Sequence, residues 1–139
     1  MAGWQDNLEK RRAEWKKLEY AMTDTLAGRR VLRVAGPRSP RLTTPVSKAV
    51  RQEELSAVAE TFDAGLACFC LGELTPEQRA QFLHNWHARL ASGATVVMAD
   101  RRSEGCTTPV ELYDLFAPLG TALDVQVGRT FWWVRYERR

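Results

Sequence analysis

The sequence lacks long apolar runs and has few cysteines. No apolar stretch among its 139 residues approaches the roughly 20 residues that a membrane-spanning helix needs, so we expect no membrane span. The first six residues lack the charged and then apolar pattern of a signal peptide. The three cysteines, Cys68, Cys70 and Cys106, are an odd number, which does not suit a disulfide framework. We therefore expect free thiols and a cytoplasmic location.

Residues that commonly bind metals are also scarce. Cys68 and Cys70 fall on a predicted strand. Because they are two residues apart, both thiols should point to one face of the strand. No second pair of ligands is near in the sequence. The two histidines, His84 and His87, are one helical turn apart and have no third ligand nearby. We interpret both histidines as solvated helix residues and predict no metal site.

Acidic residues are absent from one segment of the chain. Residues 27–52 contain no Asp or Glu but seven basic residues, so the rest of the chain sums to −4 within a net charge of +3. The basic residues are Arg29, Arg30, Arg33, Arg38, Arg41, Lys48 and Arg51. Such local basicity is typical of a surface that binds an anion and, more often, of a solvated loop. The first five arginines are the candidate anion or partner patch. Nucleic-acid binding, with Trp132 and Trp133 as stacking groups, is the less favoured interpretation.

The order of the predicted elements indicates an α/β fold. Apolar residues at helical spacing predict a helix over 4–26, which Gly28 would end. The capping signals Thr75-Pro76-Glu77-Gln78 and Thr108-Pro109-Val110-Glu111 predict two further helices, the first of which Ser92-Gly93 would stop. The remaining predicted elements are strands over 31–35, 64–71 and 94–100, a helix from Thr44-Pro45 toward Glu60, and a hairpin of 123–127 and 131–137. This alternation predicts an α/β sandwich with an antiparallel edge.

Several motifs resemble those of class I S-adenosylmethionine-dependent methyltransferases. Those that resemble the fourth strand, its helix, the following turn and the fifth strand are Phe62-Asp63-Ala64-Gly65-Leu66, Cys70-Leu71-Gly72-Glu73-Leu74, Thr75-Pro76-Glu77, Leu90-Ala91-Ser92-Gly93-Ala94 and Val97-Met98-Ala99-Asp100. Those that resemble the first, sixth and seventh strands are Gly28-Arg29-Arg30-Val31-Leu32, Phe116-Ala117-Pro118-Leu119-Gly120 and the Trp132-Trp133 hairpin. The resemblance implies a truncated Rossmann-like sheet with helices on both faces and a C-terminal antiparallel hairpin.

The cofactor-binding half of that family is poorly matched. The family places a glycine-rich loop after the first strand, whereas here Gly36 is followed by Pro37 and Arg38. A carboxylate after the second strand should accept the ribose hydroxyls, and the segment without acids offers none. The resemblance therefore implies vestigial cofactor positions at Gly36, Glu73 and Asp100, and no catalytic residue.

Length points to the same half of the chain. We divide the single domain into an N-terminal helix (1–27), a shortened and degenerate cofactor half (28–60) and a retained C-terminal half (61–139). The 27 residues of segment 36–62 leave room for one helix but not for two further strands with their crossovers. We therefore predict that the second and third strands of the family are missing. That loss would turn strand 31–35 into an edge. Arg33, the prolines after it or cover by segment 41–50 could protect this edge. The alternative, which we predict, is a homodimer or a hetero-partner there.

These observations favour binding over catalysis. The first hypothesis is a pseudoenzyme, a degenerate methyltransferase-like protein that has lost cofactor binding and acts as a binding, dimerisation or regulatory module. The alternative is an active S-adenosylmethionine-dependent methyltransferase of small molecules, with a site that a second chain completes. S-adenosylmethionine is the expected cofactor only in the alternative, in which Glu73 and Asp100 lie where ligands of open α/β sheets bind.

Overall fold

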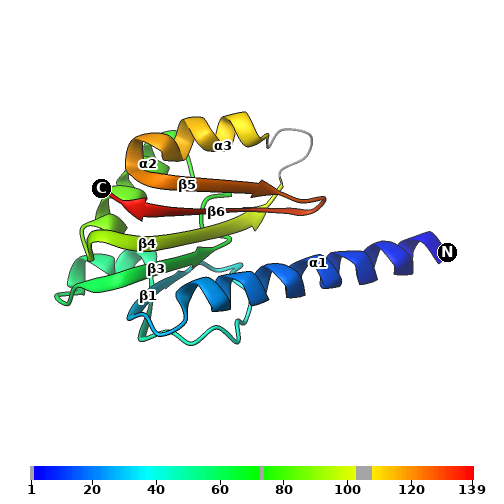
Figure 1. Cartoon of the computed structure of the whole chain (residues 1–139), viewed down its shortest axis with the longest axis horizontal. Coiled ribbons are helices and arrows are strands. Elements are labelled where there is room, and N and C mark those ends of the chain that lie inside the picture. The colour runs from blue at the N-terminus through cyan, green and yellow to red at the C-terminus, as the bar shows by residue number, and fades with distance from the viewer. Residues whose placement is uncertain (1, 73, 103–107) are drawn as a thin grey trace.

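The strands form one mixed sheet (Figure 1). The computed structural model describes residues 2–72, 74–102 and 108–139. These residues contain six strands in the spatial order β2-β1-β3-β4-β6-β5. In chain order the strands are β1 (Val31–Ala35), β2 (Lys48–Arg51), β3 (Phe62–Cys68), β4 (Leu90–Arg101), β5 (Gly120–Val127) and β6 (Phe131–Arg138). β1 to β4 are parallel, whereas β6 is antiparallel to β4 and β5. The predicted α/β sheet with a C-terminal antiparallel hairpin is confirmed.

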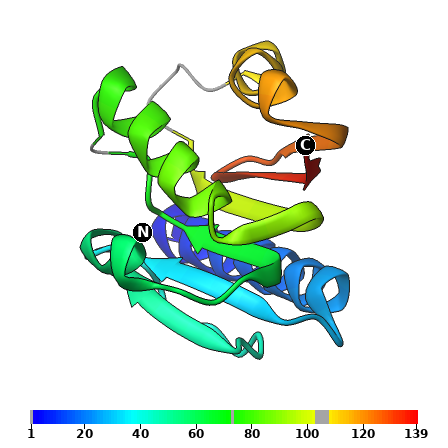
Figure 2. The same ribbon diagram turned by 90° about the vertical axis from the view of Figure 1, so that its left-hand side faces the viewer.

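Helices cover both faces of this sheet (Figure 2). α1 (Ala2–Leu26) packs on one face through Leu18, Met22 and Leu26. The elements on the opposite face are η1 (Gln52–Ala57), α2 (Pro76–His87), α3 (Pro109–Phe116) and η2 (Ala117–Leu119). Each face buries its own apolar cluster, which explains why β3 and β4 are apolar almost throughout. Within the described ranges, no helix has the length and apolar character to cross a membrane.

Capping residues fix where α2 and α3 begin. Thr75 Oγ1 accepts a hydrogen bond from the Gln78 amide at 3.2 Å, and Gln78 Oε1 accepts one from the Thr75 amide at 3.0 Å. Thr108 Oγ1 likewise accepts from the Glu111 amide at 3.3 Å. Proline follows the cap in both helices, where no amide donor is needed. The capping signals in the sequence therefore predicted both helix starts correctly.

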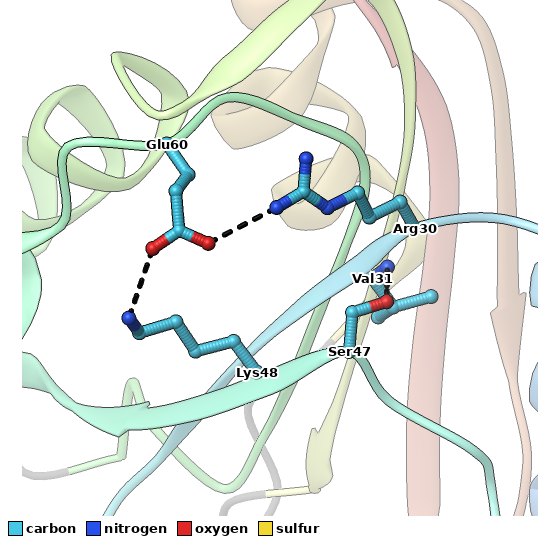
Figure 3. Close-up of polar contacts among 5 residues, drawn as sticks. All are labelled: Arg30, Val31, Ser47, Lys48 and Glu60. Carbon is cyan, nitrogen blue, oxygen red and sulfur yellow. Dashed lines mark hydrogen bonds and ion pairs between the residues drawn. The ribbon is translucent and has the colours of Figure 1, made fainter.

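A short strand replaces the helix that we predicted from Thr44-Pro45 toward Glu60. β2 pairs with β1, and Val50 is its one buried side chain. The pairing starts at Ser47, whose amide donates to the Val31 carbonyl and whose hydroxyl accepts from the Val31 amide, both at 3.0 Å (Figure 3). The backbone groups on this side of β1 thereby gain partners that a helix over the same residues would not supply.

The connection between β1 and β2 crosses the α1 face of the sheet without a helix. Thr44, which was expected to cap a helix, instead bonds the Thr23 hydroxyl of α1 at 2.7 Å. The neighbouring Thr43 hydroxyl donates to Glu19 Oε1 at 3.1 Å. Side-chain hydrogen bonds therefore hold this loop against α1.

Pairing with β2 makes β1 an internal strand. Leu32 to Ala35 have a partner residue in both β2 and β3. The predicted edge at 31–35 is therefore wrong, and so is the location that we gave to a dimer or hetero-partner contact. The prediction that the second family strand is missing is also wrong, because β2 occupies that place. The edge is instead β2, whose shortness and terminal Lys48 and Arg51 disfavour pairing with another chain.

Two other predicted boundaries move. β3 ends earlier than predicted, at Cys68, because Phe69 adopts a left-handed backbone conformation with φ of 59°. α2 ends at His87, and Leu90 begins β4 instead of continuing the helix. Gly93, predicted to stop that helix, lies in β4 with φ of 80°. The apolar pattern runs on from α2 into β4, which hid the end of the helix.

The N-terminal half of α1 projects beyond the sheet, past the carboxyl ends of the parallel strands (Figure 1). Trp4 is 71% exposed, and residues 9–13 are exposed as well. Packing begins at Glu14, whose carboxylate accepts hydrogen bonds from the Thr130 and Phe131 amides at 3.1 and 2.9 Å. This contact ties the turn between β5 and β6 to the helix.

Candidate functional site

The carboxyl ends of β1, β3 and β4 lie together at one end of the sheet, which we call the carboxyl edge to distinguish it from the edge strands. Open α/β sheets bind ligands at this end. Gly36 follows β1, Phe69 follows β3, and Asp100 lies near the end of β4. Two of the three predicted cofactor positions, Gly36 and Asp100, thus lie at one edge. The third, Glu73, is outside the described residues.

The loop after β1 folds back onto β3. Ser39 Oγ accepts a hydrogen bond from the Gly36 amide at 2.7 Å and donates one to the Cys68 carbonyl at 2.5 Å. A Cβ on Gly36 would lie 3.3 Å from the Phe69 carbonyl oxygen, so the two backbones are close. Glycine at this position therefore allows a close approach of the chain to itself.

Cys70 lies beneath that loop. Its thiol is 3.4 Å from the carbonyl oxygens of both Val34 and Cys68. Burial raises the pKa of Cys70 to about 11, against an opposing effect of the Ser39 hydroxyl. Burial also raises the pKa of Cys68. Both groups are therefore neutral thiols near pH 7 and not activated nucleophiles.

The two thiols lie on opposite faces of the sheet. Cys68 packs in the core beneath α1, whereas Cys70 packs in the core beneath α2 and α3. Our prediction that both thiols share a face is wrong because Phe69, with its left-handed backbone, ends the strand between them. Cys106 lies outside the described residues.

Asp100 joins the ends of β3 and β4. Its carboxylate accepts hydrogen bonds from the Arg101 amide at 2.7 Å and from the Leu71 amide at 3.3 Å. Burial raises the pKa of Asp100, while the amides of Arg101, Leu71 and Gly72 oppose that shift. The carboxylate thus has backbone partners of its own, and it positions the turn that follows β3.

Two carboxylates that the sequence analysis did not consider follow β2. Glu54 Oε1 accepts hydrogen bonds from the Arg51 amide at 2.9 Å and from Arg51 Nε at 3.3 Å. Glu53 lies 3.4 Å from the same Nε atom. The bond to the Arg51 amide holds the pKa of Glu54 below its ordinary value. We missed these residues because β2 was predicted as helix. Their position becomes relevant only when they follow a strand, because ligands of this kind of sheet bind at the strand ends.

The residues at this edge differ from the S-adenosylmethionine site that the resemblance implies. The cofactor needs an open glycine-rich loop after the first strand and a free carboxylate after the second. Here Ser39 closes the loop, and Glu53 and Glu54 bind Arg51. Gln52 also directs its side-chain amide across the edge to the Cys70 carbonyl at 3.1 Å.

Aromatic side chains fill the space between α1 and the carboxyl edge. The ring centroids of Trp15 and Phe69 are 5.3 Å apart, and those of Trp15 and Phe131 are 5.1 Å apart. The Arg101 guanidinium lies 5.3 Å above the Phe69 ring, within the range of a cation–π contact. These side chains anchor α1 beside the edge.

Acidic residues from outside the basic segment neutralise much of its charge. Arg30 Nη2 and Lys48 Nζ each lie 3.0 Å from a carboxylate oxygen of Glu60 (Figure 3). The hydrogen bond from Lys48 is the main reason that the pKa of Glu60 is lowered. Together with the two glutamates on Arg51, these contacts pair three of the seven basic residues of the segment with carboxylates.

The five arginines of the predicted anion patch are divided among the two ends of β1 and the strand itself. Arg29 and Arg30 precede β1 at its amino end. Arg38 and Arg41 lie in the loop beyond its carboxyl end. Arg33 lies between the pairs, is half-buried, and donates from Nη2 to the Pro40 carbonyl at 2.7 Å. Of the two proposed stacking groups, Trp132 is buried in the core, whereas Trp133 is only partly buried.

A separate groove of about 480 Å³ lies between α2 and α3, on the face opposite α1. His87 lines it but is buried, and its Nε2 lies 2.6 Å from the Tyr136 hydroxyl. Burial lowers the pKa of His87 to about 4, and the nearby Arg138 adds to this effect. Our prediction of a solvated His87 is therefore wrong, whereas His84 is exposed as predicted.

The chain has the fold of class I S-adenosylmethionine-dependent methyltransferases. N-methyltransferase NodS from Bradyrhizobium japonicum WM9 matches 91% of this chain over 96% of its own, with a TM-score of 0.63 and 14% identity. A 1,6-didemethyltoxoflavin-N1-methyltransferase from Burkholderia thailandensis, solved with S-adenosylhomocysteine, matches 99% of this chain over 86% of its own, with a TM-score of 0.63 and 17% identity.

The chain corresponds to only part of a larger methyltransferase that it also matches. Phosphoethanolamine N-methyltransferase 2 from Haemonchus contortus matches 88% of this chain but 37% of its own, with a TM-score of 0.60 and 13% identity. No protein-family model and no curated protein matches the sequence. At these identities the likeness establishes the fold and confirms the predicted resemblance at that level.

Proposed function

We propose that the chain is a non-catalytic binding module with a methyltransferase-like fold, which does not take up S-adenosylmethionine and acts by pairing with a second protein chain. One observation carries the proposal, namely the closure of the 36–39 loop against β3. Ser39 bridges the Gly36 amide and the Cys68 carbonyl at the edge where the cofactor of this fold is expected.

Opening this loop for a ligand is unfavourable. Both Ser39 hydrogen bonds would break, and each contributes about 1 kcal/mol. Every 1.4 kcal/mol spent on opening weakens the apparent affinity about tenfold. A closed loop therefore weakens the apparent affinity for a small cofactor here by about 30-fold.

The projecting half of α1 supports a protein partner. Residues 9–13 of this half are exposed, and exposed Trp4 offers a large apolar ring to a covering surface. Asp6 and Glu9 precede the basic residues 10–12. Two such segments in antiparallel contact would place opposite charges side by side, as a two-fold symmetric interface requires. We propose a second copy of this chain as the partner, bound through α1 and not through the edge of β1.

Isothermal titration with S-adenosylmethionine and, separately, S-adenosylhomocysteine tests the loss of cofactor binding. We expect no saturable heat up to millimolar ligand. Binding with a micromolar Kd would overturn this part of the proposal. Ser39→Ala and Ser39→Thr form a matched pair, because only the second keeps the hydroxyl. Binding gained by Ser39→Ala alone would identify loop closure as the cause.

Light scattering after size exclusion tests the partner. We expect a mass near twice the 15.8 kDa of one chain at micromolar concentration, and a monomer for Trp4→Glu. Tyr20→Glu is the control, because Tyr20 is 76% exposed but lies on the half of α1 that packs on the sheet. A wild-type monomer throughout this range would overturn the homodimer.

An active methyltransferase whose site a second chain completes is the competing candidate. One observation favours it: α1 extends past the carboxyl edge, so α1 of a second copy can cover that edge (Figure 1). This candidate requires that S-adenosylmethionine bind to the wild-type dimer and not to monomeric Trp4→Glu. The titration and the mass measurement, made on both proteins, therefore separate the two functions.

A further inference from the structure

The groove between α2 and α3 has the size and lining of a small-molecule site. Its volume of about 480 Å³ lies within the range of ligand pockets. One part of the lining is apolar and consists of Ala80, Leu83, Leu115, Pro118 and Leu119. These side chains come from α2, α3 and η2, on the face of the sheet that α1 does not touch. The groove is therefore separate from the carboxyl edge and from the loop at Gly36.

Three arginines line the same groove, and none of its described lining residues is Asp or Glu. Backbone oxygens hold the three guanidinium groups. Arg79 Nε donates to the Leu71 carbonyl at 3.3 Å, and Arg138 Nε donates to the His87 carbonyl at 2.7 Å. These bonds orient the guanidinium groups without cancelling their charge.

Arg139, the third of these arginines, is held more loosely. Its Nη2 donates to the Ala117 carbonyl at 3.4 Å, and its main-chain oxygen accepts from Arg138 Nη1 at 2.8 Å. Even with a carboxylate at this last residue, three guanidinium groups leave the groove with excess positive charge. By contrast, Arg30 and Arg51 have carboxylate partners. The groove is thus a place in the described structure where guanidinium charge gathers without side-chain carboxylates.

Buried contacts beneath the groove hold one of its lining residues, His87. His87 and Tyr136 form a buried hydrogen bond, and Tyr136 also packs against Phe116 with a centroid distance of 5.6 Å. The neutral His87 adds no charge near pH 7, so the arginines set the sign of the groove. An apolar wall beside charged donors is the usual composition of a site that binds one end of a ligand by contact and the other by charge.

We propose that this groove binds a small amphipathic anion, with a carboxylate or phosphate head on the arginines and an apolar body on Leu83, Leu115 and Leu119. Guanidinium groups form paired hydrogen bonds with both kinds of oxyanion, which makes the head group the shared feature of the ligand. The proposal is independent of the carboxyl edge, so it holds whether or not S-adenosylmethionine binds there.

Octyl phosphate and octanoate are suitable probes, because they carry the two head groups on one apolar chain. Titrations below the micellar range, followed by amide chemical shifts, should show saturable binding with changes at α2, α3 and the end of β6. The stronger of the two probes identifies the preferred head group. Octanol and octyltrimethylammonium, which lack a negative charge, should bind at least tenfold more weakly.

Variants assign the binding to the groove. Arg79→Gln and Arg139→Gln should each weaken the anionic probes about tenfold, the loss expected for one charge-assisted contact. Arg135→Gln is the matched control, because Arg135 lies on the same strand as Arg138 but is exposed on the opposite face. Thermal melts establish that each variant is folded. Absence of saturable binding by both anions, equal binding of the cationic probe, or unchanged affinity in both groove variants would overturn the proposal.

Discussion

The part of the sheet around β1 and β2 and the part around β4 and β6, called its polar and apolar sides below, are stabilised by different interactions. Around β1 and β2, polar side chains make many of the connecting contacts, as Ser39 and Ser47 do with neighbouring backbone groups. Around β4 and β6, large apolar side chains are fully buried, among them Trp86, Phe116 and Tyr136. Side chains can therefore supply the hydrogen bonds that the backbone needs, and a sheet can then keep its strand order where a helical crossover is absent.

Removing Trp86 should have the largest effect, because it attacks the apolar side directly. Trp86 is 0% exposed and lies over Gly65, where an added Cβ would come within 2.7 Å of its ring. Trp86→Ala should lower the free energy of unfolding by about 4 kcal/mol, through lost burial and the cavity left behind. Urea denaturation measures this loss.

Trp86→Phe is the matched control for that variant. The Trp86 indole nitrogen is buried without a partner in the described structure, so replacing it removes no hydrogen bond. The loss should therefore be less than half that of Trp86→Ala. Equal losses in the two variants would mean that ring burial is not what stabilises this side.

Acidification should weaken the same side through His87. Its pKa is about 4 when folded and 6.5 when unfolded, so between these values only the unfolded chain binds the proton. The free energy of unfolding should therefore fall as pH drops from 6.5 to 4, by up to about 3 kcal/mol. Thermal melts across this window measure the effect.

His87→Gln should lose that pH dependence. The groups facing His87 are Tyr136, Arg138 and His84, and all three remain in the variant. Asp100, whose pKa is raised by burial, favours the folded state at low pH and is also common to both proteins. The difference between the two pH profiles therefore isolates His87, and parallel profiles would contradict this role.

Ser39→Ala tests the polar side. It removes the hydroxyl that binds the Gly36 amide and the Cys68 carbonyl, so the free energy of unfolding should fall by about 1–2 kcal/mol. Chemical denaturation followed by fluorescence measures the change. Ser56→Ala should have no effect, because this serine is exposed and its side chain has no partner in the described structure. A Ser39→Ala protein as stable as the control would remove the distinction between the two sides.

Glu60→Gln should have the smallest effect. The carboxylate is exposed to solvent, so its ion pairs with Arg30 and Lys48 are screened and contribute little (Figure 3). We expect a slight decrease in Tm at low ionic strength that disappears in about 1 M salt. A large decrease that persists in salt would show that ion pairs stabilise the polar side as much as the serines do.

The elements with a repeating pattern could be predicted from the sequence. α1 has an apolar stripe, α2 and α3 have caps at Thr75 and Thr108, and β3 and β4 have long apolar runs. β2 has neither a run nor a stripe, since Val50 is its one buried residue. Its formation depends on the unpaired side of β1, which is a tertiary property that no local pattern contains.

The positions of two candidate residues at strand ends were predictable from the sequence, but their contacts were not. Gly36 and Asp100 were placed correctly at strand ends. The closure of the loop depends on Ser39 reaching a carbonyl 29 positions away in the chain, which the local breaker pattern does not reveal. Likewise, the acid-free segment looked basic because Glu60, which binds Arg30 and Lys48, follows it in the sequence.

The contact between Glu14 and the turn before β6 has a consequence for the order of folding. It joins residues 116 and 117 positions apart, from nearly opposite ends of the chain. During synthesis α1 emerges well before Phe131, which is part of the surface that receives it. Contacts of such long sequence separation form late, because closing the chain between them is entropically unfavourable. Docking of α1 at Glu14 is therefore a late step of folding.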